Sequence, residues 1–317
     1  MTDTQKEVFK TPVNKIRLFE HGAPGSQNLK LTRKYYTEDM PDGRVKHIVQ
    51  NITDPDIVPY IPDGIGNSTD RQRIPAVLII PGGAFRRLVY NFEGEDVAKW
   101  LNSMGIAAFV LECRLPSDEH DNAEDVPLID AMRAMRVIRG RAQEFGIDEA
   151  KIGVMGFSAG GFMAALLSTA YESDVYADYK YKDEYDKLSA RPDFAVCSYP
   201  VISIDDCIEA GKRYMSEEQV LERISDSKAK ILHKYNPDKL VRPDMPPVFI
   251  CETDDDRTTL SENREGYYMA ARKAGVSAEL HIFSTGGHGY GCGDDFAQTG
   301  EWKVLFTKWI KSIGIIS

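Results

Sequence analysis

A continuous apolar run, IPAVLII at positions 74–80, ends abruptly at Pro81-Gly82-Gly83. A run that is apolar at every position, and not at alternate positions, is typical of a strand buried on both faces of a parallel sheet. Further strand-like runs follow at 106–113, 151–157, 193–200, 247–252 and 278–283. Helical segments are expected at 95–104, 126–145, 159–169, 260–274 and 299–311. Strands that alternate with helices predict an α/β fold with a mostly parallel central sheet flanked by helices.

Residues 1–73, which precede this alternation, are expected to form an N-terminal arm. Period-two alternation predicts short strands at 31–36 and 44–52. The stretch 54–73 is rich in Pro, Asp and Gly, which is typical of a loop.

The core at 74–317 contains two insertions, near 171–190 and 205–240, that the regular alternation does not need. The first is dense in Tyr and charge, and the second is expected to be helical. Two interpretations stay open: solvated surface insertions, or a partial lid over a binding site. No internal repeat and no long Gly/Ser linker divides the chain, so arm and core are expected to form one domain over 1–317.

The charge balance limits the partners of the chain, because 39 basic against 49 acidic residues give a formal net charge of −10. Nucleic-acid binding needs clustered Lys and Arg, so no nucleic acid is expected as a partner. No apolar run approaches the length of a transmembrane helix, so no membrane partner is expected either. The odd number of cysteines, 5, and the absence of an apolar signal segment favour a cytoplasmic protein. A signal already removed would leave the same pattern, and oligomeric state stays open.

Gly156-Phe157-Ser158-Ala159-Gly160 fits the G-x-S-x-G pattern, in which a serine occupies a sharp strand-to-helix turn. A buried strand is expected before this serine and a helix of small residues after it, as the pattern requires. The turn would place the Ser158 hydroxyl at a helix N-terminus, where negative charge is favoured. No phosphate-binding glycine motif accompanies it, which argues against a nucleotide-binding turn. Ser158 is therefore the candidate nucleophile.

A serine nucleophile needs a base that a third group orients. His288 lies in a Gly-Gly-His-Gly loop after the last expected strand and is the candidate base. The acid is expected after the strand at 247–252, where the chain reads Asp254-Asp255-Asp256. Two of these three are expected to be turn and capping residues. We favour Asp255, with Asp254 and Asp256 as alternatives; no further ligands support a metal-binding interpretation.

A tetrahedral intermediate of acyl transfer needs hydrogen-bond donors for its oxyanion. The Pro-Gly-Gly turn after the first central strand is where such donors are expected, together with the residue after the nucleophile. The N–H groups of Gly83, Ala84 and Ala159 are the candidates. Phe85 and Tyr290 are candidate substrate contacts, although core packing explains such aromatics equally well.

The segments PGGAF, GFSAGGFMAA, SYPVIS, TDDD and ELHIFSTGGHGYG occur in this order within residues 74–312. In order and spacing they resemble the α/β-hydrolase esterases of bacterial carbohydrate-degrading systems, above all acetylesterases and acetylxylan esterases. The resemblance implies an α/β-hydrolase fold and a small-molecule substrate, a short acyl ester, often an acetyl group on a xylan-derived sugar. No metal and no organic cofactor is expected. It also carries the nucleophile and the base over to Ser158 and His288, and the first Asp of the family's Asp-Asp pair to Asp255.

The chain departs from this group at several positions. Ala84 stands where a third glycine is usual, but it still offers an N–H. Phe162 stands where a histidine usually follows the elbow, so Phe162 is a candidate for the substrate pocket wall. Arg257-Thr258-Thr259 replaces an apolar Pro-Val stretch, which keeps the choice among the three Asp residues open.

Two alternative functions remain. A serine peptidase of the prolyl-oligopeptidase type has the same order of Ser, Asp and His, but the 73 residues before the core cannot build the large accessory domain of those enzymes. A non-catalytic binding protein of the same fold usually lacks the nucleophile or the histidine, and this chain has both.

Overall fold

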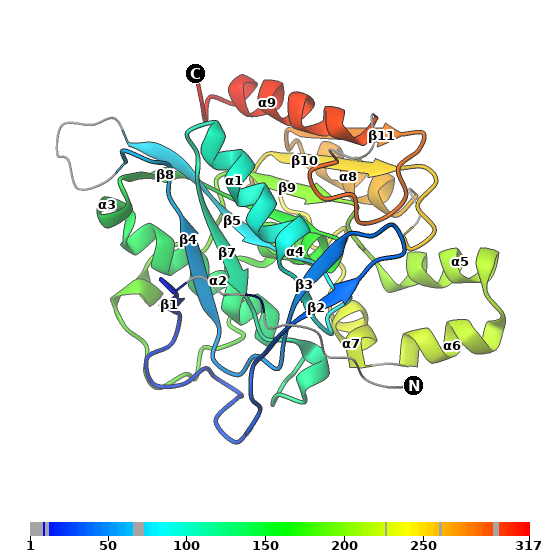
Figure 1. Cartoon of the computed structure of the whole chain (residues 1–317), viewed down its shortest axis with the longest axis horizontal. Coiled ribbons are helices and arrows are strands. Elements are labelled where there is room, and N and C mark those ends of the chain that lie inside the picture. The colour runs from blue at the N-terminus through cyan, green and yellow to red at the C-terminus, as the bar shows by residue number, and fades with distance from the viewer. Residues whose placement is uncertain (1–8, 10–12, 66–72, 226, 260–261, 294–297) are drawn as a thin grey trace.

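The computed structural model describes residues 9, 13–65, 73–225, 227–259, 262–293 and 298–317. Within these, the main sheet has the strand order β1-β4-β7-β5-β8-β9-β10-β11, and a smaller sheet has the order β2-β3-β6 (Figure 1). The strands are β1 (Ile16–Arg17), β2 (Lys34–Asp39), β3 (Val45–Gln50), β4 (Asp56–Tyr60), β5 (Ile74–Ile80), β6 (Leu88–Val89), β7 (Ala107–Glu112), β8 (Ile147–Phe157), β9 (Ala195–Ser198), β10 (Val248–Thr253) and β11 (Ala278–Phe283).

The helices are α1 (Asp96–Ser103), α2 (Val126–Gly140), α3 (Ala142–Phe145), α4 (Ala159–Ala170), α5 (Ile204–Tyr214), α6 (Glu217–Ser225), α7 (Ser227–Lys234), α8 (Glu262–Lys273) and α9 (Trp302–Ser312). Helices α2 and α4 pack together against β8, and α1 and α9 contact each other through Trp100 and Trp302. All pairings from β7 to β11 are parallel, whereas β1 and β4 join antiparallel at one edge. The predicted mostly parallel sheet flanked by helices is confirmed (Figure 1).

The arm contains a strand where the sequence predicted a loop. Strand β4 lies within the stretch 54–73 and pairs with β7 along its whole length. Its Pro59 argued against a strand, because proline cannot donate to a ladder. On its other side β4 pairs with β1 only at Asp56 and Ile57, so Pro59 lies at an edge where proline is tolerated.

The smaller sheet supports the segment that follows the Pro-Gly-Gly turn. Strand β6 pairs antiparallel with β3, with Val89 opposite Ile48. Just before β6, Arg87 forms an ion pair with Glu38 of β2, at 2.5 Å. Just after it, the N–H of Tyr90 donates to the carbonyl of His47. The arm therefore holds this turn in place.

The two insertions lie in different places. In the first, Asp186 pairs with Arg133 of α2 at 3.0 Å, so this insertion packs against that helix. The second forms α5, α6 and α7, which follow the carboxyl end of β9, and α5 and α6 stand out from the body of the molecule (Figure 1). Its Tyr235 donates to Asp125, in the loop that precedes α2. A lid function stays a prediction. Among the described residues, no helix combines the length and the apolarity needed to span a membrane.

Candidate active site

Ser158 occupies the turn between β8 and α4 with positive φ, at φ 54° and ψ −117°. This conformation is strained for any residue with a side chain, and such strain is typical of a serine nucleophile at this kind of turn. The turn packs so closely that a Cβ on Gly160 would lie 1.9 Å from the carbonyl oxygen of Ile80. Glycine is therefore required at position 160. The tight turn places Ser158 at the carboxyl end of β8.

A chain of hydrogen bonds runs from Ser158 through His288 to Asp256. The distance from Ser158 Oγ to His288 Nε2 is 2.8 Å, and that from His288 Nδ1 to Asp256 Oδ2 is 2.7 Å. The three residues follow β8, β11 and β10, and the carboxyl ends of parallel strands meet at one edge of the sheet. With Nδ1–H donating to the carboxylate, Nε2 is free to accept the serine proton.

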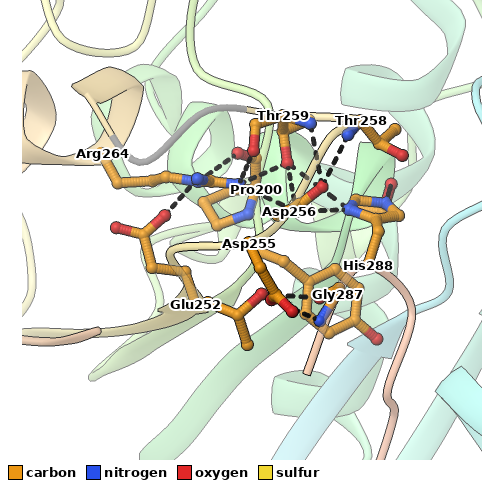
Figure 2. A network of polar contacts seen from close by, with 12 residues as sticks. Pro200, Glu252, Asp255, Asp256, Thr258, Thr259, Arg264, Gly287 and His288 are labelled. Carbon is orange, nitrogen blue, oxygen red and sulfur yellow. Dashed lines mark hydrogen bonds and ion pairs between the residues drawn. The ribbon is translucent and has the colours of Figure 1, made fainter. Parts of the chain in front are cut away.

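Asp255, the acid favoured from the sequence, does not contact His288, and that expectation is wrong. Its exposed carboxylate accepts the N–H groups of Gly287, at 2.7 Å, and Gly286, at 3.3 Å. These hydrogen bonds lower the pKa of Asp255. Asp255 therefore shapes the backbone of the histidine loop, while Asp256, one of the alternatives, faces the imidazole (Figure 2).

Asp256 combines two roles that the sequence interpretation treated as exclusive. Its Oδ1 accepts the N–H groups of Thr258, at 2.7 Å, and Thr259, at 3.1 Å, which is a capping turn. Its Oδ2 accepts from His288 Nδ1. Burial alone would raise the pKa of Asp256, but the hydrogen bond and charge of His288, with the charge of Arg264, lower it to about 2. Asp256 is therefore ionised at any pH at which the imidazole can act as a base.

The turn after β5 approaches the serine closely. A Cβ on Gly82 would lie 2.9 Å from Ser158 Cβ, and one on Gly83 would lie 2.1 Å from the carbonyl oxygen of Arg87. Gly83, Ala84 and Phe85 all have positive φ, at 136°, 57° and 59°. Among the described residues, no backbone hydrogen bond takes the N–H of Gly83, Ala84 or Ala159. These groups remain available as oxyanion donors, and that role stays a prediction.

Glu93 is a buried carboxylate beside the site that the sequence interpretation missed. Its Oε2 accepts the N–H of Gly82 at 2.8 Å, and its Oε1 accepts the hydroxyl of Tyr199 at 2.9 Å. The same hydroxyl accepts the N–H of Gly291 at 3.0 Å, and the Tyr199 ring packs edge-on to His288. Burial raises the pKa of Glu93. Through Tyr199, Glu93 thus links the turn after β5 to the loop that contains His288, and nothing in the sequence around Glu93 indicates this.

We expect Glu93→Gln to lower kcat by roughly 10- to 100-fold with little change in KM, the scale of a hydrogen bond to a charged group. If the amide oxygen accepts from Gly82, the amide N–H₂ group faces the Tyr199 hydroxyl, which then loses the acceptor for its proton. Glu95→Gln is the matched control, because Glu95 lies in the same turn but pairs with Lys99. Steady-state kinetics on both variants make the test, and equal effects would contradict this role of Glu93.

The three candidate aromatic contacts are all largely buried. Phe162 is 0 % exposed, and Tyr290, at 4 %, packs against Tyr199 with ring centroids 4.5 Å apart. For Tyr290, core packing is the alternative that the sequence left open, whereas Phe162 was expected in the pocket wall and instead lies fully in the core. Phe85 packs edge-on to Phe162 and lines a small cavity with an empty volume of about 250 Å³. Further lining residues include Gly82, Leu88, Leu115, Ala159 and Met163. The cavity therefore adjoins the turns on both sides of Ser158.

Comparison with known sequences places the chain in a family. The BD-FAE family model matches residues 65–265. An acetylxylan esterase of Xylanibacter ruminicola is 31% identical over 240 residues, which are 75% of this chain and 45% of that protein. Endo-1,4-beta-xylanase B of Butyrivibrio fibrisolvens is 30% identical over 227 residues, 71% of this chain and 34% of that protein. The chain spans less than half the length of these curated relatives.

Solved structures are similar to the chain over most of its length. An acetyl ester-xyloside bifunctional hydrolase of Caldicellulosiruptor lactoaceticus is 34% identical with a TM-score of 0.70, over 96% of this chain and 97% of that chain. The carboxylesterase Cest-2923 of Lactobacillus plantarum is 20% identical with a TM-score of 0.67, over 90% and 99% of the two chains, and shows the fold alone. The chain therefore belongs to the BD-FAE family and is an α/β-hydrolase that resembles acetylxylan esterases.

Proposed function

We propose that the chain is a serine carboxylesterase that removes short acyl groups, above all acetyl, from xylan-derived or other acetylated sugars. The observation that carries the proposal is the hydrogen-bonded chain from Ser158 through His288 to Asp256. The substrate class rests on two similar proteins, which are named an acetylxylan esterase and an acetyl ester-xyloside bifunctional hydrolase.

The geometry supports each step of the proposed ester hydrolysis. His288 Nε2 takes the proton of Ser158 Oγ as this oxygen attacks the ester carbonyl, and Asp256 stabilises the resulting imidazolium. The N–H groups of Gly83, Ala84 and Ala159 stabilise the charge that develops on the carbonyl oxygen. Collapse of the intermediate breaks the ester bond, and His288 returns its proton to the departing sugar oxygen. Water then attacks the acyl-enzyme by the same route and releases the acid.

The cavity beside Phe85 is the proposed site for the acyl group. Its walls next to Ser158 are Gly82 and Ala159, and its other walls include apolar side chains such as Leu115 and Met163. Its empty volume of about 250 Å³ includes space that opens to solvent, so the enclosed part is smaller still. A cavity of this size favours acetyl and propionyl groups over long acyl chains.

We expect kcat/KM to be highest for acetyl or propionyl esters and to fall by at least roughly tenfold by octanoyl, because a long chain does not fit the cavity. The measurement is a series of p-nitrophenyl esters from acetate to octanoate. Acetylated xylo-oligosaccharides, with released acetate measured directly, test the sugar, and aminoacyl amides serve as the peptidase control. Preference for octanoate, or faster cleavage of the amides than of the esters, would contradict the proposal.

A further inference from the structure

A fully buried ion pair, Arg264 with Glu252, lies behind Asp256, on the side of its carboxylate away from His288 (Figure 2). Arg264 is on α8 and Glu252 is in β10, and both side chains are 0 % exposed. Moving two charges out of water is unfavourable, and a buried pair is often no more stabilising than apolar residues of the same volume. Stability alone is therefore a weak explanation for this pair, and its contacts point to another.

The guanidinium of Arg264 reaches the carboxylate that faces His288, both directly and through a hydroxyl. Its Nη2 lies 3.3 Å from Asp256 Oδ2 and also donates to Thr259 Oγ1. Thr259 Oγ1 in turn donates to Asp256 Oδ2 at 2.8 Å. Because this hydroxyl accepts from Arg264, its single proton is directed at Asp256.

Arg264 is itself held on several sides. Its Nε donates to the carbonyl of Pro200 at 3.0 Å, and its Nη2 donates to the carbonyl of Thr259 at 3.1 Å. Its Nη1 faces Glu252. The planar guanidinium is therefore locked in one orientation between the ends of β9 and β10, and it transmits that orientation to Asp256.

We propose that Arg264, with Glu252 as its counter-ion, is a positioning residue that holds Oδ2 of Asp256 toward Nδ1 of His288. The inference rests on the proposed function, since it assigns a role within the same Ser158, His288 and Asp256 chain. Along the contacts the charges alternate: the imidazolium formed during the reaction, then Asp256, Arg264 and Glu252. Arg264 fixes the carboxylate but also weakens its field at the imidazole, and Glu252 offsets part of the arginine charge.

The sign of the pH effect follows from this order of charges. Replacing Arg264 and Glu252 together by neutral residues removes the full positive charge that touches Asp256. It removes at most a partial negative charge farther along the contacts, because burial raises the pKa of Glu252 to about 8. The net potential at His288 becomes more negative, so the imidazolium is favoured and a higher pH is needed to free the base. The other titratable groups that face this cluster are Glu93, Tyr199, Cys251, Glu265 and Tyr290. All of them are unchanged in the variant.

The test uses the double variant Arg264→Gln/Glu252→Gln in the full chain. Arg264→Gln alone would leave a buried carboxylate unpaired, which is strongly destabilising, whereas the double variant removes both charges and keeps similar shapes. We expect kcat to fall roughly 10- to 100-fold with KM nearly unchanged, because Arg264 does not reach the substrate. The acid limb of kcat/KM should move up by about 0.5–1 pH unit.

Two further variants make the result specific. Arg133→Gln/Asp186→Asn removes another largely buried pair, at 5 % and 7 % exposure, between α2 and the first insertion. This control should lose stability without any shift of the acid limb. Arg264→Lys keeps the charge but not the planar fork, so kcat should fall while the acid limb stays in place.

Wild-type kcat and an unshifted acid limb in the double variant would overturn the inference, as would a loss that matches the control. If the double variant does not fold, Arg264→Lys decides: reduced kcat supports the inference and wild-type kcat overturns it. Ser158→Ala in the same assay separates the two levels. An active Ser158→Ala enzyme refutes the proposed function. If Ser158→Ala is inactive but Arg264→Lys and the double variant keep wild-type kcat and an unshifted acid limb, the positioning role alone is refuted.

Discussion

Ser158→Ala should reduce ester hydrolysis by about 10⁶-fold, the loss seen when a serine nucleophile of this kind is removed. The hydroxyl of Ser158 is the group that His288 Nε2 contacts at 2.8 Å, so this oxygen is placed to give up its proton and accept the acyl group. The substitution deletes one atom at a partly exposed position and leaves the backbone turn unchanged. Turnover of p-nitrophenyl acetate, with circular dichroism and thermal unfolding to check the fold, makes the measurement.

Ser284→Ala is the control for this substitution, because Ser284 is exposed after β11 and donates to Gln298. It should keep wild-type activity. Residual activity above about 1% in a folded Ser158→Ala enzyme would contradict the role of Ser158, since that is far above the loss expected for a nucleophile.

Asp256→Asn should lower kcat by about 10⁴-fold, whereas Asp255→Asn should cost less than about tenfold. An amide at position 256 presents an N–H₂ group or a weaker acceptor to His288 Nδ1, which favours the wrong tautomer of the imidazole. At position 255 the same change leaves one carbonyl oxygen to accept from Gly287. The two variants are neighbours in the chain and have the same change in shape and charge, so each is a control for the other.

The kinetic comparison of these two variants discriminates sharply. Equal losses would mean that neither carboxylate orients the imidazole alone. A larger loss for Asp255→Asn would restore the choice made from the sequence and contradict the hydrogen bond between His288 and Asp256.

Features with a local cause could be predicted from the sequence. The sequence singled out the serine and the histidine that the structure brings within hydrogen-bond distance, because a strand-to-helix turn and a close-packed loop require glycines near Ser158 and His288. The strand at 74–80 was located to the residue, as β5, because a strand buried on both faces must be apolar throughout.

Features with a tertiary cause could not be predicted. Glu93, Glu252 and Arg264 look like ordinary charges of exposed helix and strand ends, and only the fold shows that they are buried and paired with the site. The choice of Asp256 depended on whether one carboxylate can cap a turn with one oxygen and face a histidine with the other. The sequence contains both signals, but only the three-dimensional arrangement shows that they coincide in one residue.

The central claim, that Ser158 is an activated nucleophile, is tested most directly by labelling with a fluorophosphonate, which reacts with activated serines. We expect one phosphonyl group per chain, located at Ser158 by peptide mass spectrometry, with loss of esterase activity in proportion to labelling. Ser158→Ala should not be labelled, and Asp256→Asn should be labelled far more slowly than Asp255→Asn. Full esterase activity after complete labelling, or labelling at a serine other than Ser158 that abolishes activity, would contradict the account.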